Sequence, residues 1–302
     1  MKIAIDFSVP ADLEESLRVD KFLSEYKGIL SRSQLKAKET RIFINDKEVK
    51  LSRKVKPGDK GTLEYLEEET DLLQGERVDF SVLYENSDLW VINKPQGLVV
   101  HPACGNKHGT LVQGLIHYCG DLKMEFENEN LRPGIVHRLD KDTSGVLIAA
   151  KRVTTQEFLA KQFRNRETEK WYLAFIKGKP LKERGIIKNY IKRDERNRKR
   201  FSVCLEGGKS AETEYKLLKS WGSFSLVLLK PKTGRTHQLR VHMKDLGHPI
   251  INDPVYGRVN DSLGLMLHAY RLSITLPEPE GRRTFWAPLP GRFREFLLKN
   301  RD

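Results

Sequence analysis

One aspartate in the sequence combines cationic neighbours with an apolar run that follows it. The stretch HRLDKDTSGVLIAAK, residues 137–151, places Asp140 two residues after Arg138 and beside Lys141. The apolar run 146–150 predicts a buried strand directly after this group. A carboxylate nucleophile must stay ionised although it is partly buried, and a nearby guanidinium favours its charged form. Asp140 is therefore the best candidate for a catalytic side chain.

Two parts of the sequence can supply that guanidinium. One is Arg138 in the same stretch, and the other is Arg235 or Arg240 in KTGRTHQLRVH, residues 232–242. An Arg-x-Asp triplet alone is more often a structural ion pair than a reactive group. The triplet gains meaning only together with the residues around it.

The sequence lacks the motifs of several common enzyme classes. It contains no H-E-x-x-H, no G-x-x-x-x-G-K-[ST], no G-x-G-x-x-G that opens a helix and no G-x-S-x-G. His237 and His242 are five residues apart, which does not place them on one helical face, so a zinc site is not indicated. We therefore expect acid–base or covalent catalysis by ordinary side chains, with no metal, no nucleotide cofactor and no other cofactor.

The composition favours a polyanionic partner. The 302 residues contain 54 Lys and Arg against 41 Asp and Glu, a net charge of +13. Such a balance favours binding to nucleic acid, where release of counterions contributes to affinity. The three cysteines show no C-x-x-C spacing, and no stretch has the length of a signal-peptide core or a membrane span. We expect a reduced, cytoplasmic protein without a membrane partner.

The elements that must position these residues fall into two parts. We expect a small N-terminal domain with its acidic linker over residues 1–75, with a core at 17–66, and a catalytic domain over 76–302. The core carries 13 Lys and Arg against 7 Asp and Glu, which suggests a nucleic-acid-binding face. Its expected elements are a helix at 18–26, a second helix opened by a capping box of Ser31 and Gln34, a hairpin around Asn45-Asp46 and a strand at 62–66.

The second part mixes short strands with a few helices, so the class is α+β with more strand than helix. The basic run 186–200 is read as a mobile hairpin that meets phosphates or, equally, as a solvated loop. The other expected elements are two strands around Lys94-Pro95 within 89–102, a helix at 110–118, a strand at 146–150, a helix opened by a capping box of Thr154 and Glu157, strands at 171–176 and 224–229, and a helix through 239–246 that Gly247 ends.

The motifs as a set resemble one family. HRLDKDTSG (137–145) resembles the signature H-R-L-D-x-x-T-S-G of the RluA-type pseudouridine synthases of large-subunit ribosomal RNA, matched at each fixed position. Residues 17–66 resemble the S-four type RNA-binding domain, through RVDKFL (18–23), SRS (31–33) and VKPGD (55–59). Further landmarks follow in order: NKPQGLVVHP (93–102), EKWYLAFI (169–176), KTGRTHQLRVHM (232–243), LGHPIINDPVYG (246–257) and LMLHAYRL (265–272).

The resemblance implies a mixed, mostly antiparallel sheet with flanking helices, and the isomerisation of uridine to pseudouridine in RNA. It implies that Asp140 is the nucleophile, that Tyr172 stacks on the flipped uracil and handles a proton at carbon 5, and that Arg235 pairs with the carboxylate. Arg138 would enter the base stack as the target uridine leaves it, and His137 would also bind the RNA substrate. Leu267 would form an apolar wall of the uracil pocket.

The implied partner is RNA, most naturally ribosomal, and we expect a monomer. The residues expected to contact RNA outside the pocket are Lys21, Arg32, Lys188, Lys192 and Arg193. His237 either contacts a phosphate or is a loop histidine whose hydrogen bonds are made within the protein. We slightly prefer the second alternative. Attack at carbon 6 of the base and at carbon 1 of the ribose both stay open, because both use the same aspartate.

Two other functions are alternatives to the pseudouridine synthase that the resemblance implies. A non-catalytic RNA-binding ribosome-assembly factor would have no use for Asp140, Tyr172 and Arg235 together. An aspartyl-phosphate phosphatase would need its aspartate at the end of an apolar strand, whereas here the strand follows the aspartate.

Overall fold

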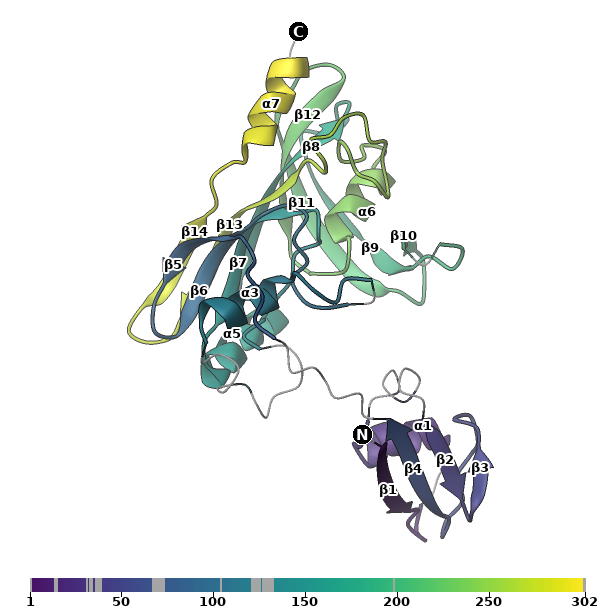
Figure 1. Cartoon of the computed structure of the whole chain (residues 1–302). Helices are drawn as coiled ribbons and strands as arrows, with labels where there is room; N and C mark the ends of the chain where they lie inside the picture. The colour runs from purple at the N-terminus through teal and green to yellow at the C-terminus, as the bar shows by residue number, and fades with distance from the viewer. Residues whose placement is uncertain are drawn as a thin grey trace. The chain divides into compact units, whose positions relative to one another are not determined.

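The structure, a computed structural model, divides into two compact units, Met1–Leu72 and Leu73–Asp302 (Figure 1). Each unit is described by itself below. The residues described are 2–13, 16–30, 32, 35, 40–66, 74–103, 105–120, 126, 133–197 and 199–300. The expected capping box of Ser31 and Gln34 and most of the acidic linker lie outside these residues.

The small unit is a four-stranded antiparallel sheet beside a short helical segment, with strand order β1-β4-β2-β3. Phe22 and Leu23 of the helical segment are fully buried against Ile42 and Leu63 of the sheet. The expected helix, hairpin and strand are confirmed, whereas β1 was not anticipated. The elements are β1 (Lys2–Ser8), α1 (Val19–Lys21), η1 (Phe22–Tyr26), β2 (Arg41–Ile44), β3 (Lys47–Val49) and β4 (Lys60–Leu66).

The large unit contains one sheet of ten strands within the described residues, ordered β10-β9-β11-β12-β8-β13-β7-β6-β5 with β14 beside β13. All neighbours are antiparallel except β13 and β7, which confirms the expected α+β class with a mostly antiparallel sheet. The elements are β5 (Ser81–Glu85), β6 (Leu89–Lys94), α3 (Leu111–Tyr118), β7 (Ser144–Ala150), α5 (Val153–Asn165), β8 (Glu169–Lys177), β9 (Arg184–Arg193), β10 (Phe201–Cys204), β11 (Lys209–Ser220), β12 (Phe224–Pro231), α6 (Gln238–Asp245), β13 (Leu267–Leu276), β14 (Gly281–Trp286) and α7 (Gly291–Asn300).

Strand β7 lies inside the sheet, between β13 and β6. All seven residues of β7 are buried, as expected for a strand covered on both faces. Leu159 of α5 packs with one set of β7 side chains, and Leu115 of α3 packs with the other set. The loop that carries Asp140 therefore enters a rigid strand only a few residues later.

Two expectations about element boundaries are wrong. Residues 95–102 do not form a second strand, because the carbonyls of Val99 and Val100 accept the amides of Leu111 and Val112 at the start of α3. Helix α5 begins at Val153 with Arg152 as N-cap and no side-chain cap, so Thr154 lies within the first turn.

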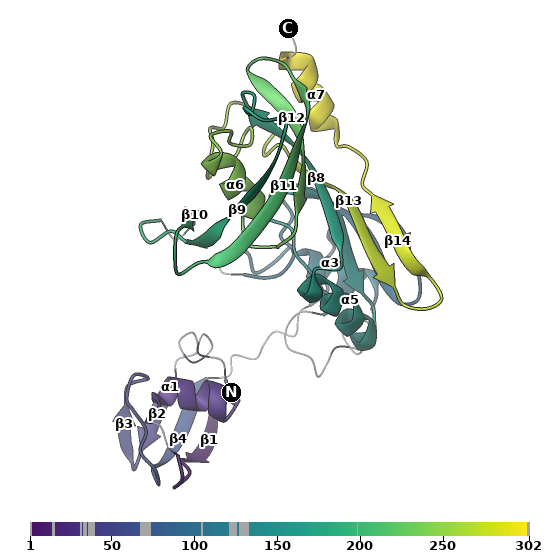
Figure 2. The same ribbon diagram turned by 180° about the vertical axis from the view of Figure 1, so that it is seen from behind.

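The basic run 186–200 forms most of a hairpin. Strand β10 pairs with the end of β9 in antiparallel register, with Phe201 opposite Arg193. This pair lies at one edge of the sheet order, and both views show it projecting beyond α6 (Figures 1 and 2). Among the described helices, none combines the length and the apolar character needed to cross a membrane.

Candidate active site

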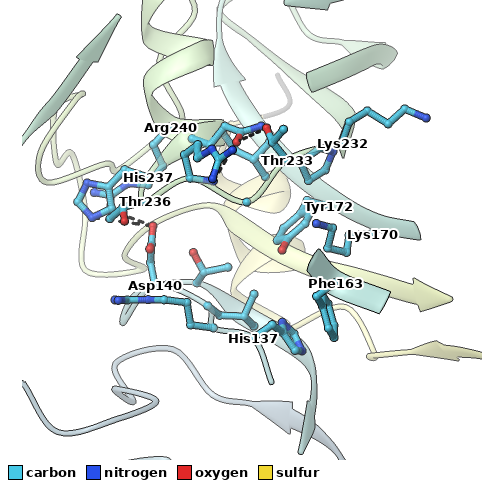
Figure 3. A pocket seen from close by; sticks show the side chains of 18 of the residues that line it. His137, Asp140, Phe163, Lys170, Tyr172, Lys232, Thr233, Thr236, His237 and Arg240 are labelled. Carbon is cyan, nitrogen blue, oxygen red and sulfur yellow. Dashed lines mark hydrogen bonds and ion pairs between the residues drawn. The ribbon is translucent and has the colours of Figure 1, made fainter. Parts of the chain in front are cut away.

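A cavity of about 550 Å³ lies where the loop before β7 meets β8 and the turn before α6. Its volume falls in the range of small-molecule and nucleotide sites. The residues that line it include Asp140, Tyr172, Arg240 and Leu267, together with Phe163 of α5. Figure 3 shows Asp140 pointing toward His237 and Arg240, with Tyr172 across the pocket.

A buried lysine holds the Asp140 loop in place. The Nζ of Lys94, which is fully buried, donates hydrogen bonds to the carbonyls of Pro95, Leu98 and Lys141 at 2.7–3.1 Å. Burial lowers the pKa of Lys94 to about 7, although the charge of Asp140 opposes this shift. No role for Lys94 was predicted from the sequence, where its position in NKPQG was the available signal.

The guanidinium that pairs with Asp140 belongs to Arg240, not to Arg235. The Nη1 of Arg240 lies 3.4 Å from Oδ2 of Asp140. Arg235 also lines the pocket, but its Nε donates to the carbonyl of Ser210 at 3.0 Å. The expected pairing of Arg235 with Asp140 is therefore wrong, and Arg240 takes that place. Of the two arginines, the one on the first turn of α6 faces the carboxylate, and the one in the preceding turn faces β11.

Arg240 is itself held by a second carboxylate. Its Nε and Nη2 donate to the two oxygens of Asp253, each at 2.8 Å. Burial acts to raise the pKa of Asp253, but the Arg240 guanidinium and the backbone amides of Val255 and Tyr256 outweigh it, and the pKa lies below its usual range. The pair satisfies the rule that buried charges need partners.

Tyr172 and Leu267 come from neighbouring strands of the sheet. Tyr172 lies on β8 and faces the cavity, and Leu267 begins β13 opposite Ala174. Burial, together with the charge of Asp140, raises the pKa of the Tyr172 phenol above its usual value. The phenol therefore stays protonated at neutral pH, and Leu267 supplies an apolar surface nearby.

His237 lies against the carboxylate and is fixed from behind. It adopts a left-handed backbone conformation (φ 57°) as the N-cap of α6. Its Nδ1 hydrogen-bonds the hydroxyl of Tyr256 at 2.9 Å, and its Nε2 lies 4.0 Å from Oδ2 of Asp140. The ring is thus a loop histidine whose hydrogen bond is made within the protein, which is the slightly preferred of the two alternatives given above. It also lies near Asp140.

Comparison with known proteins identifies the family. Residues 88–245 match the family described as RNA pseudouridylate synthase. The ribosomal large subunit pseudouridine synthase D of Borreliella burgdorferi is 46% identical over 293 residues, which span 94% of this chain and 90% of the relative. The chain belongs to the RNA pseudouridylate synthase family. It is thus an isomerase that acts on RNA.

Two further comparisons agree. An uncharacterised RNA pseudouridine synthase of Bacillus subtilis is 40% identical, with 94% of each chain covered. The solved structure of human RNA Pseudouridylate Synthase Domain Containing 1 superposes with a TM-score of 0.59 at 28% identity, covering 72% of this chain and 86% of the human one.

In this synthase, His137 is held by the protein itself. Its ring stacks on Phe163 with centroids 4.4 Å apart, and its Nε2 accepts the amide of Ile148. Burial, with a smaller contribution from Lys170, lowers the pKa of His137 to about 3. His137 therefore lines the pocket as a neutral ring, whereas Arg138 is exposed at its edge.

The side chains that were expected to contact RNA outside the pocket lie on the surface. Each of them also interacts with another side chain of this protein. Lys188 pairs with Glu212, Lys192 with Glu195, and Arg193 lies over the ring of Phe201.

In the small unit, Lys21 lies 3.8 Å from Glu25, and Arg32 donates to the buried Asp20.

Over the described ranges of the chain, no cluster of three or more His, Cys, Asp or Glu side chains could hold a metal ion.

Proposed function

We propose that this synthase converts uridine to pseudouridine in large-subunit ribosomal RNA, with Asp140 as the nucleophile. The observation that supports the nucleophile is the meeting of three groups in one cavity: a carboxylate, the Arg240 guanidinium beside it and the Tyr172 ring across from it. A clamp without catalysis has no need for that arrangement.

The reaction needs little more than these groups. The bond between carbon 1 of the ribose and nitrogen 1 of uracil breaks, the base turns, and a bond from carbon 1 to carbon 5 forms. The proton lost from carbon 5 is balanced by one gained at nitrogen 1, so there is no redox change. Asp140 forms the transient covalent bond, at carbon 6 of the base or carbon 1 of the ribose.

The neighbours of Asp140 divide the remaining work. A base within a helix is out of reach, so the uridine must leave the stack, and exposed Arg138 is placed to enter the space it leaves. Tyr172 then stacks on the uracil. Because its phenol is protonated, it accepts the carbon 5 proton as it passes its own proton on, and the base gains one at nitrogen 1. Leu267 forms an apolar wall of the pocket.

The choice of ribosomal RNA has separate support. Two relatives that align over most of their length carry the name ribosomal large subunit pseudouridine synthase D. The basic β9–β10 hairpin and the small unit resembling the S-four type domain offer contacts to a large folded RNA through Lys188, Lys192, Arg193, Lys21 and Arg32. The proposal includes a monomer in the cytoplasm, where ribosomal RNA is modified.

The decisive variant is Asp140→Asn, with Asp142→Asn as the matched control two residues away. We expect Asp140→Asn to bind RNA within about threefold of the wild type and to lower the rate of pseudouridine formation by at least about 10³-fold, since nucleophile removal has effects of this size. A fully active Asp140→Asn protein would refute the nucleophile.

The RNA target is tested separately, by mapping pseudouridines in total RNA from cells with and without the gene. Sites lost from large-subunit ribosomal RNA and restored by the wild type, but not by Asp140→Asn, support the proposal. Restoration of ribosome assembly by Asp140→Asn would instead favour an assembly factor.

A further inference from the structure

Tyr256 connects the β9–β10 hairpin to the candidate active site. It lies in the loop after α6 and is 5% exposed. Its hydroxyl accepts a hydrogen bond from the backbone amide of Phe201, at the start of β10, at 2.8 Å. The same hydroxyl bonds Nδ1 of His237 at 2.9 Å. One oxygen atom therefore touches both the hairpin and the histidine beside Asp140.

The donors in this chain of contacts have a defined direction. The amide of Phe201 can only donate, so the proton of the Tyr256 hydroxyl is free to go to Nδ1 of His237. Burial lowers the pKa of His237, which keeps one ring proton at neutral pH. With Nδ1 as acceptor, that proton sits on Nε2, which lies 4.0 Å from Oδ2 of Asp140. The opposite tautomer would turn a lone pair toward a negative charge.

The ring of Tyr256 makes a second connection. The guanidinium of Arg240 lies 5.2 Å from the ring centroid, and that of Arg200, in the turn of the hairpin, lies 5.6 Å from it. Arg240 is the residue that pairs with Asp140. His237 and Arg240, which lie 4.0 Å and 3.4 Å from Oδ2 of Asp140, therefore both contact Tyr256.

The base of the hairpin packs on the same residue. Tyr256 forms a cluster with Ile191 of β9 and Val241 of α6, with Phe201 and Val203 of β10 against it. Phosphates drawn to the basic side chains of the hairpin would therefore fix the position of Phe201 and Arg200, and with them Tyr256.

We propose that Tyr256 is a positioning residue that couples RNA engagement at the β9–β10 hairpin to the orientation of the Asp140 carboxylate. The inference rests on the role of Asp140 given under Proposed function. The simpler alternative is that Tyr256 only fills the hairpin base.

The first test is Tyr256→Phe, which removes the hydroxyl and keeps the ring between the two arginines. We expect the single-turnover rate constant at saturating RNA to fall about tenfold, the size of one hydrogen bond lost, with Kd for RNA unchanged within twofold. Tyr84→Phe is the matched control, because its hydroxyl bonds Glu280 and does not line the pocket. An unchanged rate constant for Tyr256→Phe overturns the proposal.

The second test is a double-mutant cycle with Arg196→Ala/Lys199→Ala, two exposed residues of the hairpin turn. In the wild-type background this pair should weaken RNA binding and lower the saturating rate constant about threefold. In the Tyr256→Phe background the effect on affinity should persist, and the effect on the rate constant should become smaller, because the hydroxyl contacts are lost while the ring contacts with Arg200 and Arg240 remain. Additive losses in rate, or no loss in the wild-type background, contradict coupling.

Failure here is separable from failure of the proposed function. If Asp140→Asn is inactive while the cycle is additive, only the coupling role of Tyr256 is wrong. If Asp140→Asn is active, the nucleophile assignment fails whatever Tyr256 does.

Discussion

At the scale of single residues, the Arg240 guanidinium lies between two carboxylates. Its Nε and Nη2 bind Asp253, and its Nη1 reaches Asp140. Only a planar, forked cation can serve both carboxylates in this way. The sequence shows the two candidate arginines, Arg235 and Arg240, five residues apart. It does not show which of the two side chains points toward Asp140. Those depend on the left-handed backbone of His237 and on the carbonyl of Ser210 in a distant strand.

Arg240→Lys tests this assignment against Arg235→Lys. The lysine keeps a charge but loses the fork, so Asp253 loses one of its two bonds from this side chain. We expect a fall of at least about 100-fold in the rate constant and a loss of about 3 kcal/mol in the free energy of unfolding. Arg235→Lys should change the rate constant by less than about fivefold. Equal losses for the two variants, in single-turnover assays, would return the pairing role to Arg235.

Tyr172→Phe separates stacking from proton transfer. The ring remains, so RNA affinity should hold within about twofold. If the phenol handles the carbon 5 proton, the rate constant should fall by about 10²–10⁴-fold, the usual size of general acid–base effects. A deuterium isotope effect at carbon 5 should then appear in the variant. A wild-type rate would leave Tyr172 with stacking alone.

At the scale of elements, the parallel pair β7–β13 sets the position of the Asp140 loop. Gly145 lies opposite Ala269 at φ +119°, and a Cβ there would meet the Ala269 carbonyl oxygen at 2.1 Å. The glycine of the signature is therefore required by the close approach of a neighbouring strand. Periodicity alone could predict β7, but not its partner.

Gly145→Ala should thus cost about 3 kcal/mol or more in the free energy of unfolding, since strain and a backbone clash act together. It should also lower activity, because Asp140 lies five residues away. Gly222→Ala is the control, with φ +71° and open space around it, and should cost about 1 kcal/mol. Denaturant unfolding of both variants measures the difference. Equal costs would show that the Ala269 contact does not matter.

The same scale explains the mistaken strand at 95–102. The apolar pattern was correct in indicating burial, since Leu98 and Val100 are buried under α3. The strand was wrong because this segment gives its carbonyls to the amides at the start of α3 and to the side chain of Lys94, and apolar periodicity indicates neither partner.

At the scale of the whole molecule, the two units differ sharply in charge. Residues 1–72 carry 14 Lys and Arg against 15 Asp and Glu, whereas residues 73–302 carry 40 against 26. The basic balance of the chain therefore belongs to the catalytic unit. Composition predicted a polyanionic partner, but the basic core 17–66 was only part of a unit whose acidic flanks cancel it.

Three buried histidines should make the catalytic unit sensitive to acid. Burial lowers the pKa of His242 and of His268 to about 4 and, with a smaller contribution from Lys170, that of His137 to about 3. Above the unfolded value near 6.5 both states are neutral, and below it the unfolded chain takes up protons that the folded chain refuses. Stability should therefore fall between about pH 6.5 and 4, by up to about 1.4 kcal/mol per pH unit for each histidine.

All four tryptophans lie in residues 73–302, so tryptophan fluorescence in denaturant reports this unit within the intact chain. His242→Gln can still bond Thr213 and Asn189 without titrating, and it should reduce the slope of stability against pH by at most about a third, because His137 and His268 still titrate. An unchanged slope would mean that other groups govern acid unfolding.

The division of charge between the units has a consequence for how the enzyme searches among cellular RNAs. Nonspecific dwell time on any polyanion grows with the positive charge that a protein presents. An appended unit that is close to neutral can add shape-selective contacts without lengthening stays on wrong transcripts. The enzyme then spends a larger share of its bound time on the cognate RNA than on other RNAs. Release of the modified RNA also stays fast, so it does not limit turnover.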